Sequence, residues 1–154
     1  MSFQAAFDAL NLELPPAPKA IGLYRPLIVV GNLAYTSGHG PLLADGTLTT
    51  GRVGDQLTVE EGYQAARQTG LATLATLLEN LGSLDRVARL VKTFGLVHAT
   101  ADFTDHPAVV NGFSELMRDV FGAECGIAAR SAVGAVSLPA GMSVEVEAVF
   151  ELAE

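Results

Sequence analysis

Arg130 is the residue of this 154-residue chain whose surroundings most suggest chemistry. Two-residue alternation predicts a strand over Ala129–Val136, with Ala132, Gly134 and Arg130 on one face. These neighbours are small, so the guanidinium has open space beside it, and its planar fork can hold a carboxylate through two parallel hydrogen bonds. The pattern indicates an anion-binding pocket. In an alternative interpretation, Arg130 pairs with a glutamate of the next strand and the small residues only allow close packing.

The strand that follows Arg130 alternates just as clearly. Residues 144–152 place valine, alanine, phenylalanine and leucine on one face and three glutamates on the other: Glu145, Glu147 and Glu151. The link Ser137–Met142 contains Pro139 and Gly141, which are typical of a chain reversal. The sequence therefore predicts a β-hairpin made of these two strands, with Arg130 and the glutamates on its second face.

The remaining elements follow from periodicity and end signals. We expect a strand pair around Gly31-Asn32, a long helix from the capping box at Thr58 to Gly82, a strand over Val87–Ala99, and a second helix from Asp105 to Gly122. A short helix opened by Ser2 and ended before Pro15 precedes them. The prediction is an α+β domain, residues 20–154, with two amphipathic helices on one face of a mixed sheet and an N-terminal extension, residues 1–19.

Composition narrows the classes of function. A formal net charge of −8 with scattered basic residues argues against a nucleic-acid partner. No apolar run is long enough to span a membrane and no leader pattern is present, so we expect a cytoplasmic protein without a membrane partner. The Gly-rich segment 38–56 lacks a phosphate-loop pattern, and no Cys/His cluster has zinc-ligand spacing, so no cofactor or metal is expected.

Four further residues are expected to be structural or inert. His39 lacks a paired carboxylate in sequence and is more typical of a loop residue held by a backbone partner than of a catalytic base. His98 and His106 are expected to be structural. Cys125 is expected in a loop, Gly122–Gly126, without a basic neighbour to favour its thiolate.

Two helices can cover only one face of the predicted sheet. The second face, with its mixture of small, apolar and charged groups, suits contact with another copy of the chain. We therefore expect an oligomer whose sites lie at the subunit contacts.

From Ala17 to Glu151 the chain resembles the RidA/YjgF family of reactive-intermediate deaminases, also called L-PSP-like. The resemblance is carried by the order and spacing of short motifs: Ala20-Ile21-Gly22-x-Tyr24, Thr36-Ser37-Gly38, Val91-Lys92-Thr93, Val110-Asn111, Ala129-Arg130-Ser131, Leu138-Pro139 and Val144-Glu145-Val146-Glu147-Ala148. The N-terminal extension and the Gly-rich loop are similar to the longer, mostly uncharacterised branch of that family.

The resemblance implies a chorismate-mutase-like fold, a homotrimer, and hydrolysis of 2-imino acids, formed from enamines such as 2-aminoacrylate, to 2-keto acids and ammonia. By motif match, Arg130 would hold the substrate carboxylate and Glu145 would orient or activate water. The residues that would line the pocket are Tyr24, Ser37, Gly38, Asn111 and Ala132.

Three positions depart from the family pattern. Ala132 stands where members often have a cysteine, Ala128 where they often have a proline, and His39 where a polar amide is common. Because imine hydrolysis needs a carboxylate clamp and a positioned water but no thiolate, activity is still expected, and the substrate range is left open by these departures. The alternatives are a non-catalytic module that binds small keto or amino acids, and, third, an endoribonuclease.

Overall fold

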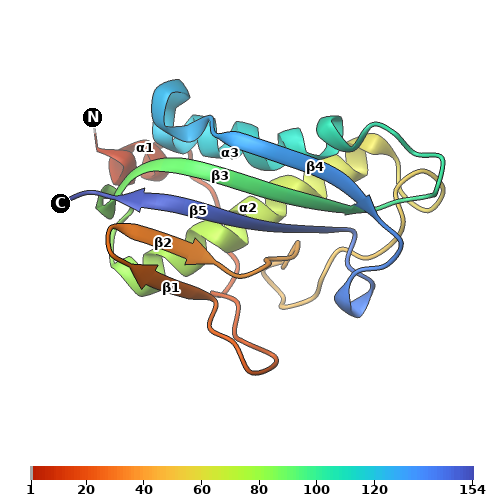
Figure 1. Ribbon diagram of the computed structural model, residues 1–154, viewed down its shortest axis with the longest axis horizontal. Helices are drawn as coiled ribbons and strands as arrows, with labels where there is room; N and C mark the ends of the chain where they lie inside the picture. The colour runs from red at the N-terminus through yellow and green to blue at the C-terminus, as the bar shows by residue number, and fades with distance from the viewer. Residues whose placement is uncertain (1) are drawn as a thin grey trace.

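A computed structural model describes residues 2–154 and shows one five-stranded sheet (Figure 1). The strand order is β1-β2-β5-β3-β4, and every neighbouring pair is antiparallel except β3 and β4, which are parallel. The strands are β1 Leu27–Val30, β2 Leu33–Thr36, β3 Val87–His98, β4 Ala129–Ala135 and β5 Val144–Leu152. The mixed sheet and the strand pair around Gly31 are confirmed.

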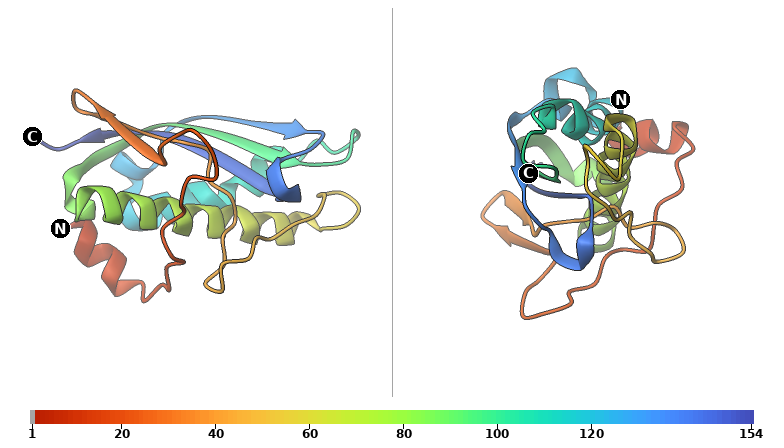
Figure 2. Two further views of the ribbon diagram at one scale, coloured as in Figure 1. Left: turned by 90° about the horizontal axis from the view of Figure 1, so that it is seen from below. Right: turned by 90° about the vertical axis from the view of Figure 1, so that its right-hand side faces the viewer.

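Two long helices, α2 (Val59–Leu81) and α3 (His106–Gly126), lie on one face of this sheet and leave the other open (Figure 2). The predicted start of α2 is confirmed, because the Thr58 side chain accepts from the Glu61 backbone N–H and the Glu61 carboxylate accepts in return from Thr58. Its end is confirmed as well, with Gly82 left-handed at φ 79°.

The core lies between these helices and the sheet. Its largest fully buried side chains come from all three elements, with Leu74 and Leu77 on α2, Phe113 and Phe121 on α3, and Phe150 on β5. The helices approach closely at Gly112, where a Cβ atom would lie 2.0 Å from the Tyr63 carbonyl oxygen. A glycine is therefore required at this contact.

The N-terminal segment forms the predicted short helix, α1 (Phe3–Ala9), capped by Ser2. Phe3 packs edge-on against Phe121 at 5.2 Å between ring centroids, and Phe7 is buried in the core. The Asp85 carboxylate accepts hydrogen bonds from the Ser2 hydroxyl and from the backbone N–H of Gln4. The helix is thus fastened to the domain, whereas the division of the chain between residues 19 and 20 stays a prediction.

The predicted hairpin of the last two strands is wrong in its pairing. Both strands form where expected, but β3 lies between β4 and β5 and pairs with each of them. The single-turn 3₁₀ helix η2 (Pro139–Gly141) lies in the link that carries the chain over the end of β3. β3 is twelve residues long and largely apolar. If β4 and β5 paired directly, β3 would lie at the edge of the sheet with one row of its backbone groups unpaired.

Gly122 also differs from its predicted role as a helix stop. Its backbone is left-handed, with φ 77° and ψ 166°, but helical turns resume and α3 runs on to Gly126. Cys125 consequently lies in the last turn of α3 and not in a loop. A second short 3₁₀ helix, η1 (Leu84–Arg86), connects α2 to β3.

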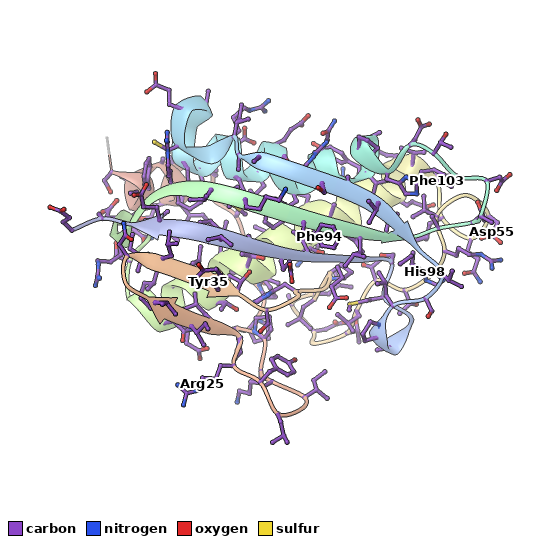
Figure 3. All side chains as sticks on the ribbon, viewed as in Figure 1. Arg25, Tyr35, Asp55, Phe94, His98 and Phe103 are labelled. Atoms are coloured by element: carbon purple, nitrogen blue, oxygen red, sulfur yellow. The ribbon has the colours of Figure 1, made fainter. Side chains whose placement is uncertain are left out.

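The open face of the sheet carries exposed apolar side chains. Tyr35 and Val133 are about two-fifths exposed and Ile28 nearly half exposed, and Phe94 stands on the same face between them (Figure 3). Within the same residues, 2–154, no helix has the length and apolar character needed to cross a membrane.

Candidate active site

Four of the predicted site residues meet in one pocket, which we call the Glu145 pocket: Tyr24, Ser37, Gly38 and Glu145. Ser37 and Gly38 continue β2 along the first half of β5, where the backbones of His39 and Val146 exchange hydrogen bonds of 2.8 and 2.9 Å. Tyr24 comes from the segment that loops out beyond β1 (Figure 1). The Ser37 hydroxyl donates to the Arg25 carbonyl at 2.6 Å and ties that segment to the pocket floor.

Gly38 and Glu145 are in direct contact. A Cβ atom at position 38 would lie 2.2 Å from Oε1 of Glu145, 2.8 Å from Cδ and 3.0 Å from Cγ. The Glu145 carboxylate therefore occupies the space above the glycine, and only hydrogen at this position leaves room for it.

Partial burial beside a second carboxylate changes the acidity of Glu145. Burial raises the pKa of Glu145 above its ordinary value of 4.5, and the negative charge of Glu147 raises it further. No cation pairs with Glu145 within residues 2–154. A carboxylate with a raised pKa and no cationic partner is a better proton acceptor than an ordinary one.

His39 supports the pocket floor from below. The buried ring donates from Nδ1 to the Ser37 carbonyl at 2.7 Å, and Nε2 lies 2.7 Å from the Thr76 hydroxyl on α2. Burial lowers the pKa of His39 below 6.5, an effect that the hydrogen bond to Ser37 partly offsets. The neutral ring with a proton on Nδ1 therefore fits this site, and His39 acts as the backbone-held residue that the sequence predicts.

Arg130 belongs to a second group of polar residues, the Arg130 cluster, formed by Arg130, Asn111 and Ser114. Nη1 of Arg130 donates to Oδ1 of Asn111 at 2.8 Å and to Oγ of Ser114 at 3.1 Å. The guanidinium makes no ion pair in the part of the chain that the structure describes, so its pairing with a glutamate of the next strand is wrong. Its Nη2 and Nε donors stay available for a bound anion.

The two groups lie on opposite faces of the sheet in one copy of the chain. Arg130 contacts α3, so it points to the helix face, whereas Val144 and Val146 are buried there and Glu145 points to the open face. The prediction that Arg130 and the glutamates share a face is wrong. It assumed direct pairing of β4 with β5, and the insertion of β3 removes the basis for it.

Ala132 follows Arg130 on the helix face, and Gly134 closes that row. A Cβ atom at Gly134 would lie 2.6 Å from Nε2 of His106, so the first turn of α3 packs directly on β4. The space beside Arg130 is therefore bounded by α3 at one end. Ala132 shares the face of Arg130 as predicted, and its role in lining a pocket stays a prediction.

Several residues of the Glu145 pocket are absent from the sequence prediction. They come from the Gly-rich loop, from the residues before Tyr24, and from the link before β5: Pro18, Lys19, Leu42, Leu48, Ala140 and Met142. For Leu42 and Leu48 the only sequence signal is the unusual length of the Gly-rich loop, which indicates an added wall without naming its residues. Within residues 2–154 no group of three or more His, Cys, Asp or Glu side chains is arranged to hold a metal ion.

The fold and site define an α+β protein with a cavity beside Glu145, whose side chain points to the open face of the sheet. Residues 4–150 match the family model described as "YjgF/chorismate_mutase-like, putative endoribonuclease", and the chain belongs to this YjgF/RidA family.

The relatives match over nearly the whole chain. Protein TCP17 of Trypanosoma cruzi is 40% identical, covering 96% of this chain and 92% of its own length. The RutC family protein y4sK of Sinorhizobium fredii is 30% identical, covering 88% of this chain and 92% of its own length. The crystal structure of Atu1372 from Agrobacterium tumefaciens, a protein of unknown function, superposes with a TM-score of 0.88 at 33% identity, covering 98% of this chain and 94% of that one.

Proposed function

We propose that the protein is a hydrolytic deaminase of 2-imino acids, of the 2-aminoacrylate/2-iminopropionate type, and that it works as a homotrimer. The observation that carries this proposal is the division of the site. Arg130 offers anion-binding donors without a carboxylate partner in residues 2–154, and Glu145 is a carboxylate with a raised pKa and no cation beside it. Arg130 can hold the substrate carboxylate but offers no proton acceptor, and Glu145 can accept a proton but cannot hold a carboxylate, so a working site needs both.

A second copy of the chain can bring the two groups together. Arg130 lies on β4 at one edge of the sheet, whereas the Glu145 pocket lies on the open face near the ends of β2 and β5. The apolar side chains of that face, among them Tyr35 and Val133, are exposed in one copy and would be buried by a neighbour. Contacts that repeat head to tail and close after three copies would give three equivalent sites, each built from two subunits.

The chemistry requires little of the protein beyond positioning. Arg130 of one copy would hold the substrate carboxylate, which places the electrophilic C2 atom over Glu145 of the next. Water adds to C2 as the C=N electron pair moves to nitrogen, and Glu145 passes the proton lost by water to that nitrogen. In the second half of the reaction, Glu145 transfers the hydroxyl proton of the resulting carbinolamine to its amino nitrogen. The C–N bond then breaks, and the 2-keto acid and ammonia leave.

Two other functions compete with this proposal. A module that only binds small keto or amino acids would use the same clamp but would have no need for a carboxylate with a raised pKa. The family description also mentions an endoribonuclease, but the net charge of −8 disfavours a polyanionic substrate.

The test is steady-state hydrolysis of 2-iminopropionate, generated in situ from alanine by an amino-acid oxidase, with ammonia and pyruvate measured together. We expect turnover by the natural chain and a decrease in kcat/KM of about 1.5 to 3.5 decades for Arg130→Ala, from a clamp worth roughly 2–5 kcal/mol. Ser114→Ala is the control, because it removes one hydrogen bond to Nη1 and keeps the charge. Ligand-dependent stabilisation without turnover would identify a binding module instead.

A further inference from the structure

The cavity that contains Glu145 extends well beyond the groups that hydrolysis of a small imine would need. In a single copy of the chain its volume is about 670 Å³. A three-carbon imino acid has six non-hydrogen atoms and at roughly 30 Å³ each, the share of a water molecule in the liquid, needs under about 200 Å³. Most of the additional wall is apolar and is formed by Pro18, Ile21, Leu42, Leu48, Pro139 and Met142.

The added wall is a built structure and not a loose loop. Leu42 and Leu48 face each other across a small hairpin, closed by a hydrogen bond from the Leu43 N–H to the Thr47 carbonyl at 2.8 Å. The Gln68 side chain on α2 donates to the Leu42 carbonyl at 2.6 Å. At the other end, the backbone N–H and hydroxyl of Ser143 both donate to the Thr49 carbonyl at 3.1 Å. The apolar surface is therefore already in place before a ligand binds.

A glycine sets the shape of the cavity floor. A Cβ atom at Gly40 would lie 2.5 Å from Sδ of Met142 and 3.4 Å from a methyl carbon of Leu48. Its absence leaves room for the thioether of Met142 and the methyl group of Leu48 beside the backbone of Gly40. Methionine is a flexible and polarizable side chain, so the floor can adapt to apolar groups of different shapes.

We propose that the preferred substrates are 2-imino acids with a large apolar side chain, of the size of leucine, methionine or phenylalanine. This inference rests on the proposed function, because it assigns the substrate class of the same site. The carboxylate and C2 would lie at the Arg130 cluster and Glu145, and the side chain would extend toward Leu48 and Met142. Since a single methylene in a hydrophobic pocket can change kcat/KM tenfold or more, we expect at least about tenfold preference for the imine of leucine over that of alanine.

The test uses imines made in situ from alanine, leucine and phenylalanine, with matched variants of the hairpin. Leu48→Asn keeps the approximate size of a half-buried cavity side chain and makes it polar. The control is Leu43→Asn, the same change at an exposed position of the same hairpin that does not line the cavity. We expect Leu48→Asn to lower kcat/KM about tenfold for the leucine imine, with little change for the alanine imine, and Leu43→Asn to change neither. Melting temperature and light scattering check fold and assembly.

Equal kcat/KM for the three imines would overturn the substrate class and leave the deaminase proposal intact. If no imine is hydrolysed, the deaminase proposal fails. Calorimetry with pyruvate and 4-methyl-2-oxopentanoate, the 2-keto acids that correspond to alanine and leucine, then tests whether the site prefers large apolar side chains. Binding of 4-methyl-2-oxopentanoate at least about tenfold tighter than pyruvate, lost in Leu48→Asn, would support the apolar class for a binding site. Equal affinities would overturn it.

Discussion

The contact between Gly38 and Glu145 allows the role of the carboxylate to be tested without removing it. In Gly38→Ala the new Cβ atom would lie 2.2 Å from Oε1, whereas ordinary contact begins at 3.4 Å. The carboxylate must therefore retreat by about 1 Å, a misplacement that can lower turnover on the order of 100-fold. The end of a half-buried glutamate moves easily, so we expect the melting temperature to change by no more than about 4 °C.

The assay is steady-state imine hydrolysis together with thermal unfolding of the same preparation. Gly22→Ala is the control, because a Cβ atom at Gly22 meets only the Tyr24 ring at 3.9 Å. A Gly38→Ala protein that is folded, assembled and fully active would refute the reasoning. A similar loss of activity in Gly22→Ala would show that the effect belongs to the Tyr24 segment and not to the carboxylate.

Three further predictions concern protonation and the thiol. Activity should fall as the pH decreases through the raised pKa of Glu145. Glu145→Gln should lower kcat about 10²–10⁴-fold and lose this acidic limb of the pH profile. The variant should also be more stable at neutral pH, because ionising Glu145 in the folded natural protein costs stability as the pH rises above 4.5. Because the pKa of His39 is lowered, the free energy of unfolding should fall as the pH decreases below 6.5. Denaturant titrations at several pH values should show that the free energy of unfolding of His39→Asn depends less on pH in this range. Cys125→Ser should keep full activity, and an inactive but folded variant would contradict a thiol-free reaction.

The helices and individual strands could be predicted because their signals are local. The capping box at Thr58, the glycine at position 82 and the alternation in β5 each depend on residues close in sequence, and the structure has each of them in place. Strand pairing is not local. Proline and glycine between β4 and β5 suggest a reversal, but they do not reveal that β3 takes the place between the two strands.

The candidate site could be predicted only in its parts. Motifs identify Arg130 and Glu145, but the face to which each points depends on the strand order, so the division of the site was not visible in the sequence. The apolar wall has the same limitation. Leu42 and Leu48 come from a Gly-rich loop without periodicity, and their position depends on hydrogen bonds to residues far away in sequence, Gln68 and Ser143.

The central claim is that each site is built from two copies of the chain, and subunit mixing tests it most directly. Arg130→Ala and Glu145→Gln would be unfolded, mixed in equal amounts and refolded together, with each variant refolded alone as a control. With random assembly in a closed ring, one neighbouring pair in four combines an intact Arg130 with an intact Glu145, so the mixture should recover about a quarter of the natural activity. A mixed assembly that forms but stays as inactive as its two parents would contradict a site shared between subunits.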